Sequence, residues 1–316
     1  MKRIPALLAG ASIVGLSLIA AAPASAAGNA IDPGDSLYAL ACDDVPAWQL
    51  YGVDAPSAVM TEIGAGTTSD SENYGCSYQA AYNPATGVSY YIQTNMGYSA
   101  LATIDVTTGF SGTIAEFYFP NNEFPEFPQV QAMAIGGDGS AFALSDGRLF
   151  SIDLETAIVT YVGETVDDTY AFAWDSVTGG FYAVDDSNEL YQVDVTDGSV
   201  VDLGPIVFPN EEDNNYYTYS LQFDEAGTLW LEVDFDYPDG YDSSLWSLSL
   251  SAIDATVYSD LTTVAGEPVY IESLLIVPGT PVALAATGSE VAPIAAGALA
   301  LLVLGGAVLV MRRRTA

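Results

Sequence analysis

The sequence has very few basic residues and no histidine at all. Against 41 aspartates and glutamates stand six lysines and arginines, which gives a formal net charge of −35 over 316 residues. Lys2, Arg3 and Arg312–Arg314 lie at the ends, so Arg148 is the single base of the body. The lack of histidine excludes Ser-His-Asp and Cys-His nucleophiles and histidine-ligated metals. The lack of lysine in the body excludes a Schiff-base lysine and a P-loop.

The same charge balance excludes nucleic acid as a partner, because no basic patch can displace the counterions of the phosphates. The chemistry that remains to the body is that of carboxylates, hydroxyls, amides and aromatic rings. The body is rich in Tyr, Phe, Val and Thr, with Gly and Asp at short intervals, which predicts an all-β fold.

The first 26 residues have the layout of a secretory signal peptide. Lys2 and Arg3 form a basic start, Ala6–Ala21 is apolar, and Pro23–Ala26 offers small residues where a signal peptidase reads the chain. We therefore expect export, with cleavage after Ala26 or Ala27. An uncleaved membrane anchor is the alternative, and Pro23 and the small residues after it argue against that anchor.

The C-terminal end has three parts in a fixed order. A pentapeptide comes first, then the 20 uncharged and largely apolar residues Val291–Val310, and then the basic tail of residues 311–316. The pentapeptide is Leu284, Ala285, Ala286, Thr287 and Gly288. A helix of 20 residues spans about 30 Å, enough to cross a bilayer, and the arginines after it would stay in the cytoplasm. The sequence therefore predicts a C-terminal transmembrane helix.

Together the three parts resemble the cell-wall sorting signal of Gram-positive surface proteins, in the variant typical of high-GC actinobacteria. Ala285 stands where the commonest form of the motif has proline. The resemblance implies that a sortase cuts between Thr287 and Gly288 and joins Thr287 to an amine of the peptidoglycan. The precursor would then be membrane-anchored and the mature protein bound to the cell wall. A plain membrane anchor is the alternative.

The body repeats one short phrase five times. It occurs at Leu50–Asp54, Leu101–Asp105, Leu149–Asp153, Leu190–Asp194 and Leu245–Ser249, at spacings of 41 to 55 residues. Each copy alternates apolar residues with small or polar ones, as a half-buried strand does. A strand, a tight turn and an aromatic strand precede four of the copies, and a short turn and another strand follow each. Each unit therefore holds four strands, which we name a to d.

Four-stranded units of this length resemble the blades of a β-propeller. The N-terminal unit has strands b, c and d (Ser36–Leu40, Leu50–Asp54 and Ala58–Ile63), and a lone strand a lies at Tyr270–Val277. A blade shared by both chain ends would close the ring without an exposed edge. We predict a propeller of five four-stranded blades over residues 36–280, with residues 27–35 as a lead-in and 281–290 as a linker. Six blades or an open sandwich are the alternatives.

The long insertions all fall between strands b and c or between d and a, which places them on one face of the ring. Binding commonly uses loops on a rigid scaffold. We therefore expect this loop-rich face to contact a ligand through acidic and aromatic side chains, namely Trp48, Glu123, Phe124, Phe127, Tyr216 and Tyr217. Solvated loops without a ligand are the alternative.

One of these insertions spaces four carboxylates by two or three residues, at Asp234, Asp236, Asp239 and Asp242. Oxygen ligands at such spacing suit Ca²⁺, although the pattern is not that of an EF-hand. The segment is a candidate calcium loop, and a solvated acidic turn is the alternative.

Cys42 and Cys76 are the two cysteines of the chain. In an exported protein a disulfide between them is the expected state. They end strand b of the shared blade and begin strand a of the next blade, so the bond would pin the N-terminal segment.

These observations favour a surface-displayed binding module without catalytic activity, whose ligand is a glycan, a protein or a divalent cation. The expected partners are a sortase, the peptidoglycan and an extracellular ligand. A glycoside hydrolase, which needs two carboxylates, is one alternative. A structural envelope protein whose acidity supplies charge is another.

Overall fold

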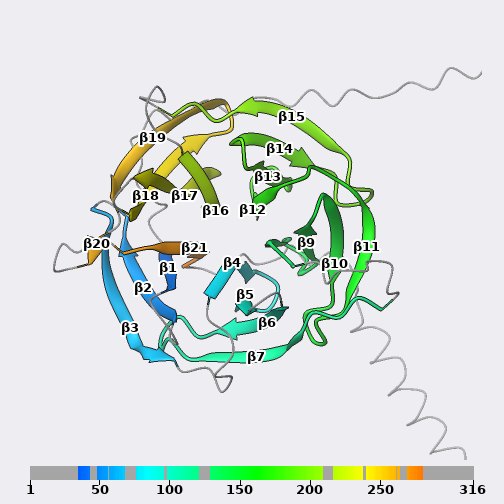
Figure 1. Cartoon of the computed structure of the whole chain (residues 1–316), viewed down its shortest axis with the longest axis horizontal. Helices are drawn as coiled ribbons and strands as arrows, with labels where there is room; N and C mark the ends of the chain where they lie inside the picture. The colour runs from blue at the N-terminus through cyan, green and yellow to red at the C-terminus, as the bar shows by residue number, and fades with distance from the viewer. Residues whose placement is uncertain are drawn as a thin grey trace, which may run out of the picture.

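The computed structural model describes residues 35–42, 48–55, 57–67, 76–95, 98–120, 129–208, 216–237, 240–260, 262–263 and 269–279. These residues form a ring of five sheets, seen end-on in Figure 1. The leader, the sorting pentapeptide and the apolar tail lie outside the described residues. Within the described residues no helix is long and apolar enough to cross a membrane.

Four of the sheets are antiparallel meanders of four strands, and the fifth has a short additional strand; each sheet runs outward from the axis of the ring (Figure 1). Blade 2 holds β4 (Cys76–Asn83), β5 (Val88–Asn95), β6 (Tyr98–Ile104) and β7 (Ser111–Glu116). Blade 3 holds β8 (Ala132–Ile135), β9 (Ala141–Ser145), β10 (Arg148–Ile152) and β11 (Val159–Glu164). Blade 4 holds β12 (Thr169–Trp174), β13 (Phe181–Asp185), β14 (Glu189–Val193) and β15 (Val200–Pro205). Blade 5 holds β16 (Tyr216–Phe223), β17 (Thr228–Tyr237), β18 (Gly240–Ser249) and β19 (Ala252–Asp260).

Blade 1 joins the two ends of the body. Its inner strand is β21 (Ile271–Val277), which pairs with β1 (Ser36–Cys42), followed by β2 (Trp48–Asp54) and β3 (Val59–Thr67). The register runs from Ser36 opposite Val277 to Ala41 opposite Ile271. The predicted five-bladed propeller with a shared closing blade is therefore confirmed.

Five apolar clusters hold the ring together, one between each pair of neighbouring blades. Successive residues of a strand point to opposite faces of the sheet, so each blade serves two clusters. On β5, Tyr90 packs toward blade 3 and Tyr91 toward blade 1. On β10, Leu149 packs toward blade 4 and Phe150 toward blade 2. Burial of such a side chain contributes about 1.5–3 kcal/mol to stability. The apolar positions that repeat in the sequence are therefore the positions that form the core.

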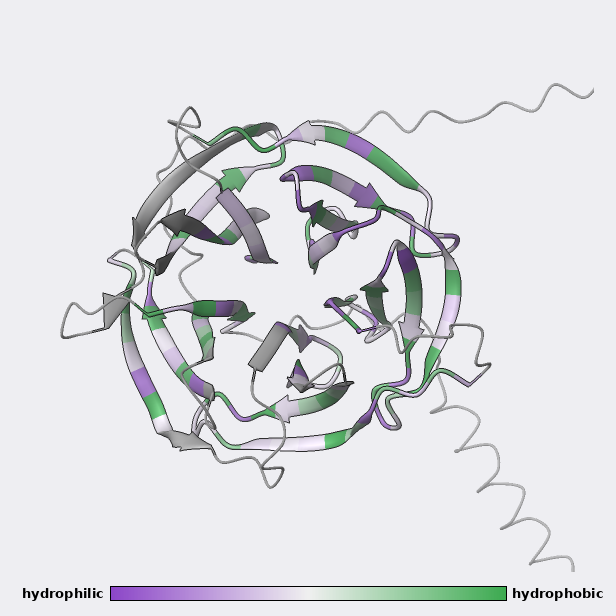
Figure 2. Cartoon of the chain, in the orientation of Figure 1, coloured by the Kyte–Doolittle hydropathy of each residue, from purple (hydrophilic) through white to green (hydrophobic). Residues whose placement is uncertain are grey.

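Linkers between blades also pair with the outer strand of the next blade. The sequence did not indicate this pairing. After β7, Tyr118 exchanges hydrogen bonds with Ala157 and Val159 at the edge of blade 3. The chain after β19 forms β20 (Thr262–Thr263), which pairs in parallel with the start of β3. Figure 2 shows that the rim strand β15 is mostly hydrophobic, although its Val201 is 58% exposed.

The connections between strands lie on two opposite faces of the ring. The turns after strands a and c are short, and we call their side the turn face. Most of the insertions on the opposite, loop-rich face lie outside the described residues. Strands extend into several of them. β16 begins at Tyr216, β5 runs to Asn95 and β6 begins at Tyr98. β17 runs to Tyr237 and β18 begins at Gly240, so that expected insertion is a tight hairpin.

Candidate functional site

The side chain of Gln79 closes the centre of the ring. It is fully buried on β4, and its amide reaches three other innermost strands. Nε2 donates to the carbonyl of Phe172 at 2.6 Å and to that of Leu221 at 3.4 Å. Oε1 accepts from the amides of Phe172 at 3.1 Å and Met133 at 3.2 Å. A bulge in β4 between Ser77 and Ala80 supplies the extra residue at this position.

A second set of buried polar groups ties the remaining inner strands together. Ser273 of β21 accepts from the amide of Ala80 at 2.7 Å, and Gln222 of β16 donates to the carbonyl of Ala80 at 2.8 Å. Ser220 of β16 accepts from the amide of Leu274 at 2.9 Å. Because these groups satisfy one another, the axis is a filled polar layer rather than an open channel.

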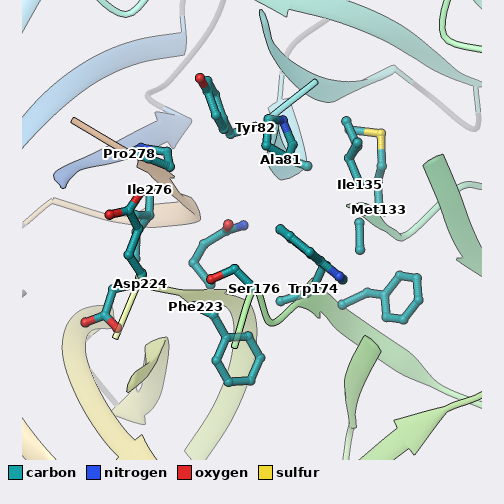
Figure 3. A pocket seen from close by; sticks show the side chains of 16 residues that line it. Ala81, Tyr82, Met133, Ile135, Trp174, Ser176, Phe223, Asp224, Ile276 and Pro278 are labelled. Atoms are coloured by element: carbon teal, nitrogen blue, oxygen red, sulfur yellow. The ribbon is translucent and has the colours of Figure 1, made fainter. Parts of the chain in front are cut away.

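On the turn-face side of this layer the axis widens into a pocket of about 60 Å³. This volume has room for roughly four waters. The walls come from the carboxyl ends of all five innermost strands and the turns after them (Figure 3). The side chains shown there include Tyr82, Met133, Ile135, Trp174, Ser176, Phe223, Asp224, Ile276 and Pro278.

Aromatic side chains give the pocket its character. Tyr82, Trp174 and Phe223 each stand immediately before the Asn or Asp that starts the turn after strand a. In Figure 3 the indole of Trp174 lies near the middle of the lining, with Tyr82 and Phe223 on opposite sides. Rings of this kind offer flat apolar faces that bind apolar groups and cations alike.

The acidic groups at the pocket are Asp224 and Glu225. Asp224 is buried, and its carboxylate accepts from the Thr228 amide at 2.8 Å and from the Trp230 indole at 3.0 Å. Burial raises the pKa of Asp224, and these hydrogen bonds oppose the rise. The carboxylate is thus held in its own turn, where it contributes negative potential rather than a mobile base. Because none of the described residues that line the pocket is basic, the site favours neutral or positively charged ligands.

The structure tests few of the residues that the sequence singled out. The pentapeptide Leu284–Gly288 and the loop residues Glu123, Phe124 and Phe127 lie outside the described residues, and so does the side chain of Trp48. Cys42 ends β1 and Cys76 begins β4, as expected. Their side chains are not described, so the disulfide stays a prediction.

The two tyrosines expected in a ligand loop belong to strand β16 instead. Tyr216 is 8% exposed and stacks on Phe208 at 4.8 Å between ring centroids, so it is a core residue. Tyr217 is half-buried, and its ring centroid lies 6.3 Å from that of Tyr219. Tyr216 cannot contact a ligand because its neighbours in the core cover it.

The candidate calcium loop is mostly a β-hairpin. β17 runs through Asp234 and Asp236, and β18 includes Asp242. Asp234 is fully buried, and its Oδ1 accepts from the hydroxyl of Ser243 at 2.6 Å. Asp239 and the side chains of Asp236 and Asp242 lie outside what is described. Among the described residues no three acidic or cysteine side chains gather in a way that could hold a metal ion.

The pocket residues were missed because no local motif marks them. Their strands start about 50 residues apart, and the pocket exists only where the ring brings the strand ends together. A signal was nonetheless present: an aromatic residue directly before the turn recurs at Tyr82, Trp174 and Phe223. Aligning the blades on their first turns would have brought these three positions into one column.

Several solved structures are similar to this chain at low identity. TolB from Acinetobacter baumannii matches at 15% identity and a TM-score of 0.43, over 72% of this chain and 53% of its own. A protein of unknown function from Bacteroides caccae matches at 8% identity and a TM-score of 0.41, over 77% and 99%. The calcium-binding protein regucalcin from Agrobacterium tumefaciens matches at 12% and 0.40, over 61% and 66%. The chain thus spans about half the length of TolB.

No curated protein matches the sequence. One family model does, over residues 22–205, which is more than half of the chain. That model is described as a repeat of unknown function, and the repeat it covers includes blades 2, 3 and 4 and strands β1 to β3 of the closing blade. The chain therefore belongs to the DUF6923 repeat family.

Proposed function

We propose that this chain is an exported binding module, joined to the cell wall through Thr287, that holds its ligand in the axial pocket without catalysis. The leader and the three-part C-terminal signal support export and wall anchoring. The observation that carries the binding role is the pocket itself, an aromatic depression to which all five blades contribute.

The size and charge of the pocket define the ligand. A volume of about 60 Å³ takes a small apolar group, of the order of a side chain, rather than a whole sugar or cofactor. The acidic rim of Asp224 and Glu225 favours a positive charge beside that group. The net charge of −35 attracts cationic ligands over longer range. We therefore propose a peptide with a small apolar side chain and a free amine.

The path of the chain indicates where this peptide comes from. Pro278, directly after β21, is part of the pocket wall, so the linker to the wall leaves from the turn face. Thr287 follows Val277 by ten residues, which can span at most about 35 Å. In the wall-bound protein the pocket then faces the peptidoglycan and the loop-rich face points outward. The peptide stems of the peptidoglycan carry small side chains and free amines, which is the chemistry the pocket fits.

Catalysis finds less support among the described residues. Glu232 and Asp234 are a close carboxylate pair, but both are fully buried between blades and reach no substrate. Asp224 is held by hydrogen bonds within its own turn. A glycoside hydrolase needs two carboxylates on either side of an accessible sugar, and neither group meets that need.

A binding screen with mass-spectrometric product analysis tests this function. The probes are soluble peptidoglycan fragments with a free stem-peptide amine, the same fragments after N-acetylation, and glycan strands without peptide. We expect saturable binding of the amine form, at least tenfold weaker binding of the acetylated form, and no cleavage. Cleavage of any probe would establish the hydrolase instead, and binding of none would leave the structural role.

A further inference from the structure

The seam where blade 5 meets the closing blade 1 contains two buried carboxylates, those of Glu232 and Asp234. The even-numbered residues of β17 face this seam, because Trp230 belongs to the apolar cluster that also holds Leu37 and Leu274 of blade 1. Glu232 and Asp234 follow Trp230 at two-residue steps, so they point to the same side. Both residues have 0% exposure.

The two carboxylates differ in their hydrogen bonds. Asp234 accepts from the hydroxyl of Ser243, whose oxygen also accepts from the amide of Ile271 in β21 at 2.9 Å. Ser243 thus connects Asp234 to the closing strand. In contrast, neither oxygen of Glu232 has a well-aligned hydrogen bond from an N–H or O–H of the described residues. An ionised carboxylate in that state would be among the most costly groups a core can hold. The nearby Ser243 hydroxyl lowers the pKa of Glu232, but this is a smaller effect than burial and the charge of Asp234, which raise it.

Every titratable group that faces Glu232 adds to this cost. The charged neighbours are Asp234 on its own strand and Glu272 on β21. Tyr270, just before β21, is near the same carboxylates and near Tyr219 of β16, and its pKa is raised by burial and by these charges. The single base of the body, Arg148, lies in blade 3 at 3.8 Å from Glu164. No side chain of the body can therefore neutralise Glu232 with a positive charge.

Burial, and after it the charge of Asp234 and a hydrogen bond to Asp234, raise the pKa of Glu232 well above its ordinary value. A hydrogen bond between two carboxyl groups requires that one of them carry the proton. The described carboxylates also do not gather in a way that would hold a metal ion in place of that proton.

We propose that Glu232 keeps its proton at neutral pH and donates it to Asp234, so that the seam closing the ring is a proton-binding site. Release of this proton to solvent would leave two adjacent buried charges, with Glu272 nearby on the closing strand. Repulsion would then act on β21, the strand whose pairing with β1 completes the ring. The seam is thereby closed in acid and neutral solution and loosened by alkali.

The direction of the pH dependence follows from linkage. The folded protein binds the Glu232 proton more tightly than the unfolded chain, in which a glutamate has a pKa of about 4.3. The stabilisation is therefore complete below that value and is lost as the pH rises through the folded-state pKa. Between the two values the unfolding constant rises about tenfold for each pH unit.

The test is the pH dependence of unfolding in the full-length chain, kept in mild detergent because of its apolar tail. Glu232→Gln keeps the volume and a hydrogen-bond donor but cannot ionise, and Asp234→Asn removes the neighbouring charge. Glu62→Gln, on the exposed side of β3, is the matched control. We expect wild type and Glu62→Gln to lose stability as the pH rises above 5. For Glu232→Gln the unfolding constant should rise by up to tenfold less per pH unit than for the wild type. The slope for Asp234→Asn should lie between those of the wild type and Glu232→Gln.

Hydrogen exchange locates the effect. In alkali the amides of β21 should exchange faster in the wild type than in Glu232→Gln. The amides of β12, the inner strand of blade 4, should exchange at the same rate in both proteins. An identical pH slope in wild type and Glu232→Gln would show that Glu232 is already ionised and overturn the proposal. A metal ion bound at the seam would also overturn it. In that case a chelator would lower the melting point of the wild type at pH 7 and calcium would raise it, and neither would change the melting point of Glu232→Gln.

Discussion

Gln79 shows how much one side chain can determine in a ring. Its amide makes hydrogen bonds with β8, β12 and β16, so a single residue of blade 2 sets the positions of three other blades at the axis. An apolar residue could fill the same space but could not satisfy the amides of Met133 and Phe172. Five blades leave an axis narrow enough for one glutamine to close, and the pocket has a floor for that reason.

Replacing this glutamine should be costly. In Gln79→Ala the buried amides of Met133 and Phe172 lose their acceptor, at about 1–3 kcal/mol for each unsatisfied group. We expect a loss of about 3 kcal/mol in the free energy of unfolding, measured by urea titration. Gln192→Ala, at a half-buried glutamine of β14, should cost less than about 1 kcal/mol. Equal effects of the two variants would mean that water replaces the Gln79 amide.

Sequence reasoning succeeded least at the scale of single residues. Tyr216 and Asp234 stand in polar, acidic surroundings in the sequence, which suggested exposed loop positions. Both are buried because long strands extend there into the expected loops. Gln79 gave no signal, since a bulge shifts it to the axis and a one-residue bulge does not disturb a short alternating pattern noticeably.

At the scale of elements, neighbouring blades contact one another through backbone atoms as well as through side chains. The turn after β14 packs on β11 of the preceding blade, where a Cβ on Gly163 would lie 1.8 Å from the carbonyl oxygen of Asp197. The turn after β6 meets β3 in the same way, through Gly64 and Gly109. Glycine is thus required where the outer strand of one blade touches the turn of the next.

Two glycine variants separate this steric demand from backbone conformation. Gly163→Ala should cost at least about 3 kcal/mol, because the turn holding Asp197 must move away from blade 3. Gly179→Ala has open space around the new methyl group but a φ of +70°, so it should cost only about 1–2 kcal/mol. Thermal unfolding of both proteins measures the difference. A Gly163→Ala protein as stable as Gly179→Ala would contradict the close packing of blades 3 and 4.

The elements themselves could largely be predicted from the sequence. The strand phrases repeat with the spacing of blades, and their alternation matches the two clusters that each sheet serves. Strand ends were less certain: the strand expected at Ser36–Leu40 runs to Cys42, and that expected at Ala58–Ile63 spans Val59–Thr67. The latching strand β20 has two residues and no periodicity to detect.

At the scale of the whole molecule, both ends of the ring leave from the turn face, beside the pocket. Asp35, which precedes β1, accepts from the amide of Glu225 at 2.9 Å, and Glu225 and Pro278 line the pocket. Ring closure, the axial pocket and the proposed tether to the wall thus meet in one region. The proton that we propose at Glu232 would act on the same closing strand, β21, near its first residue, Ile271.

The tether itself is tested by cell fractionation. Thr287→Ala removes the residue whose carboxyl group a sortase would transfer, so the protein should move from the wall fraction to the membrane or the medium. Ser289→Ala, two residues further on, should leave the wall fraction unchanged. If detergent alone extracts the wild type completely, the C-terminal segment is a plain membrane anchor.

The dissociation constant of the best amine-bearing peptidoglycan fragment, measured by calorimetry, tests the binding pocket most directly. Trp174→Ala and Tyr82→Ala remove pocket walls and should each weaken binding at least tenfold, the equivalent of about 1.4 kcal/mol. Phe110→Ala removes a ring that is 65% exposed at the turn after β6, away from the pocket, and should bind as the wild type does. Unchanged binding by the Trp174 and Tyr82 variants, with their melting points intact, would contradict the axial pocket as the ligand site.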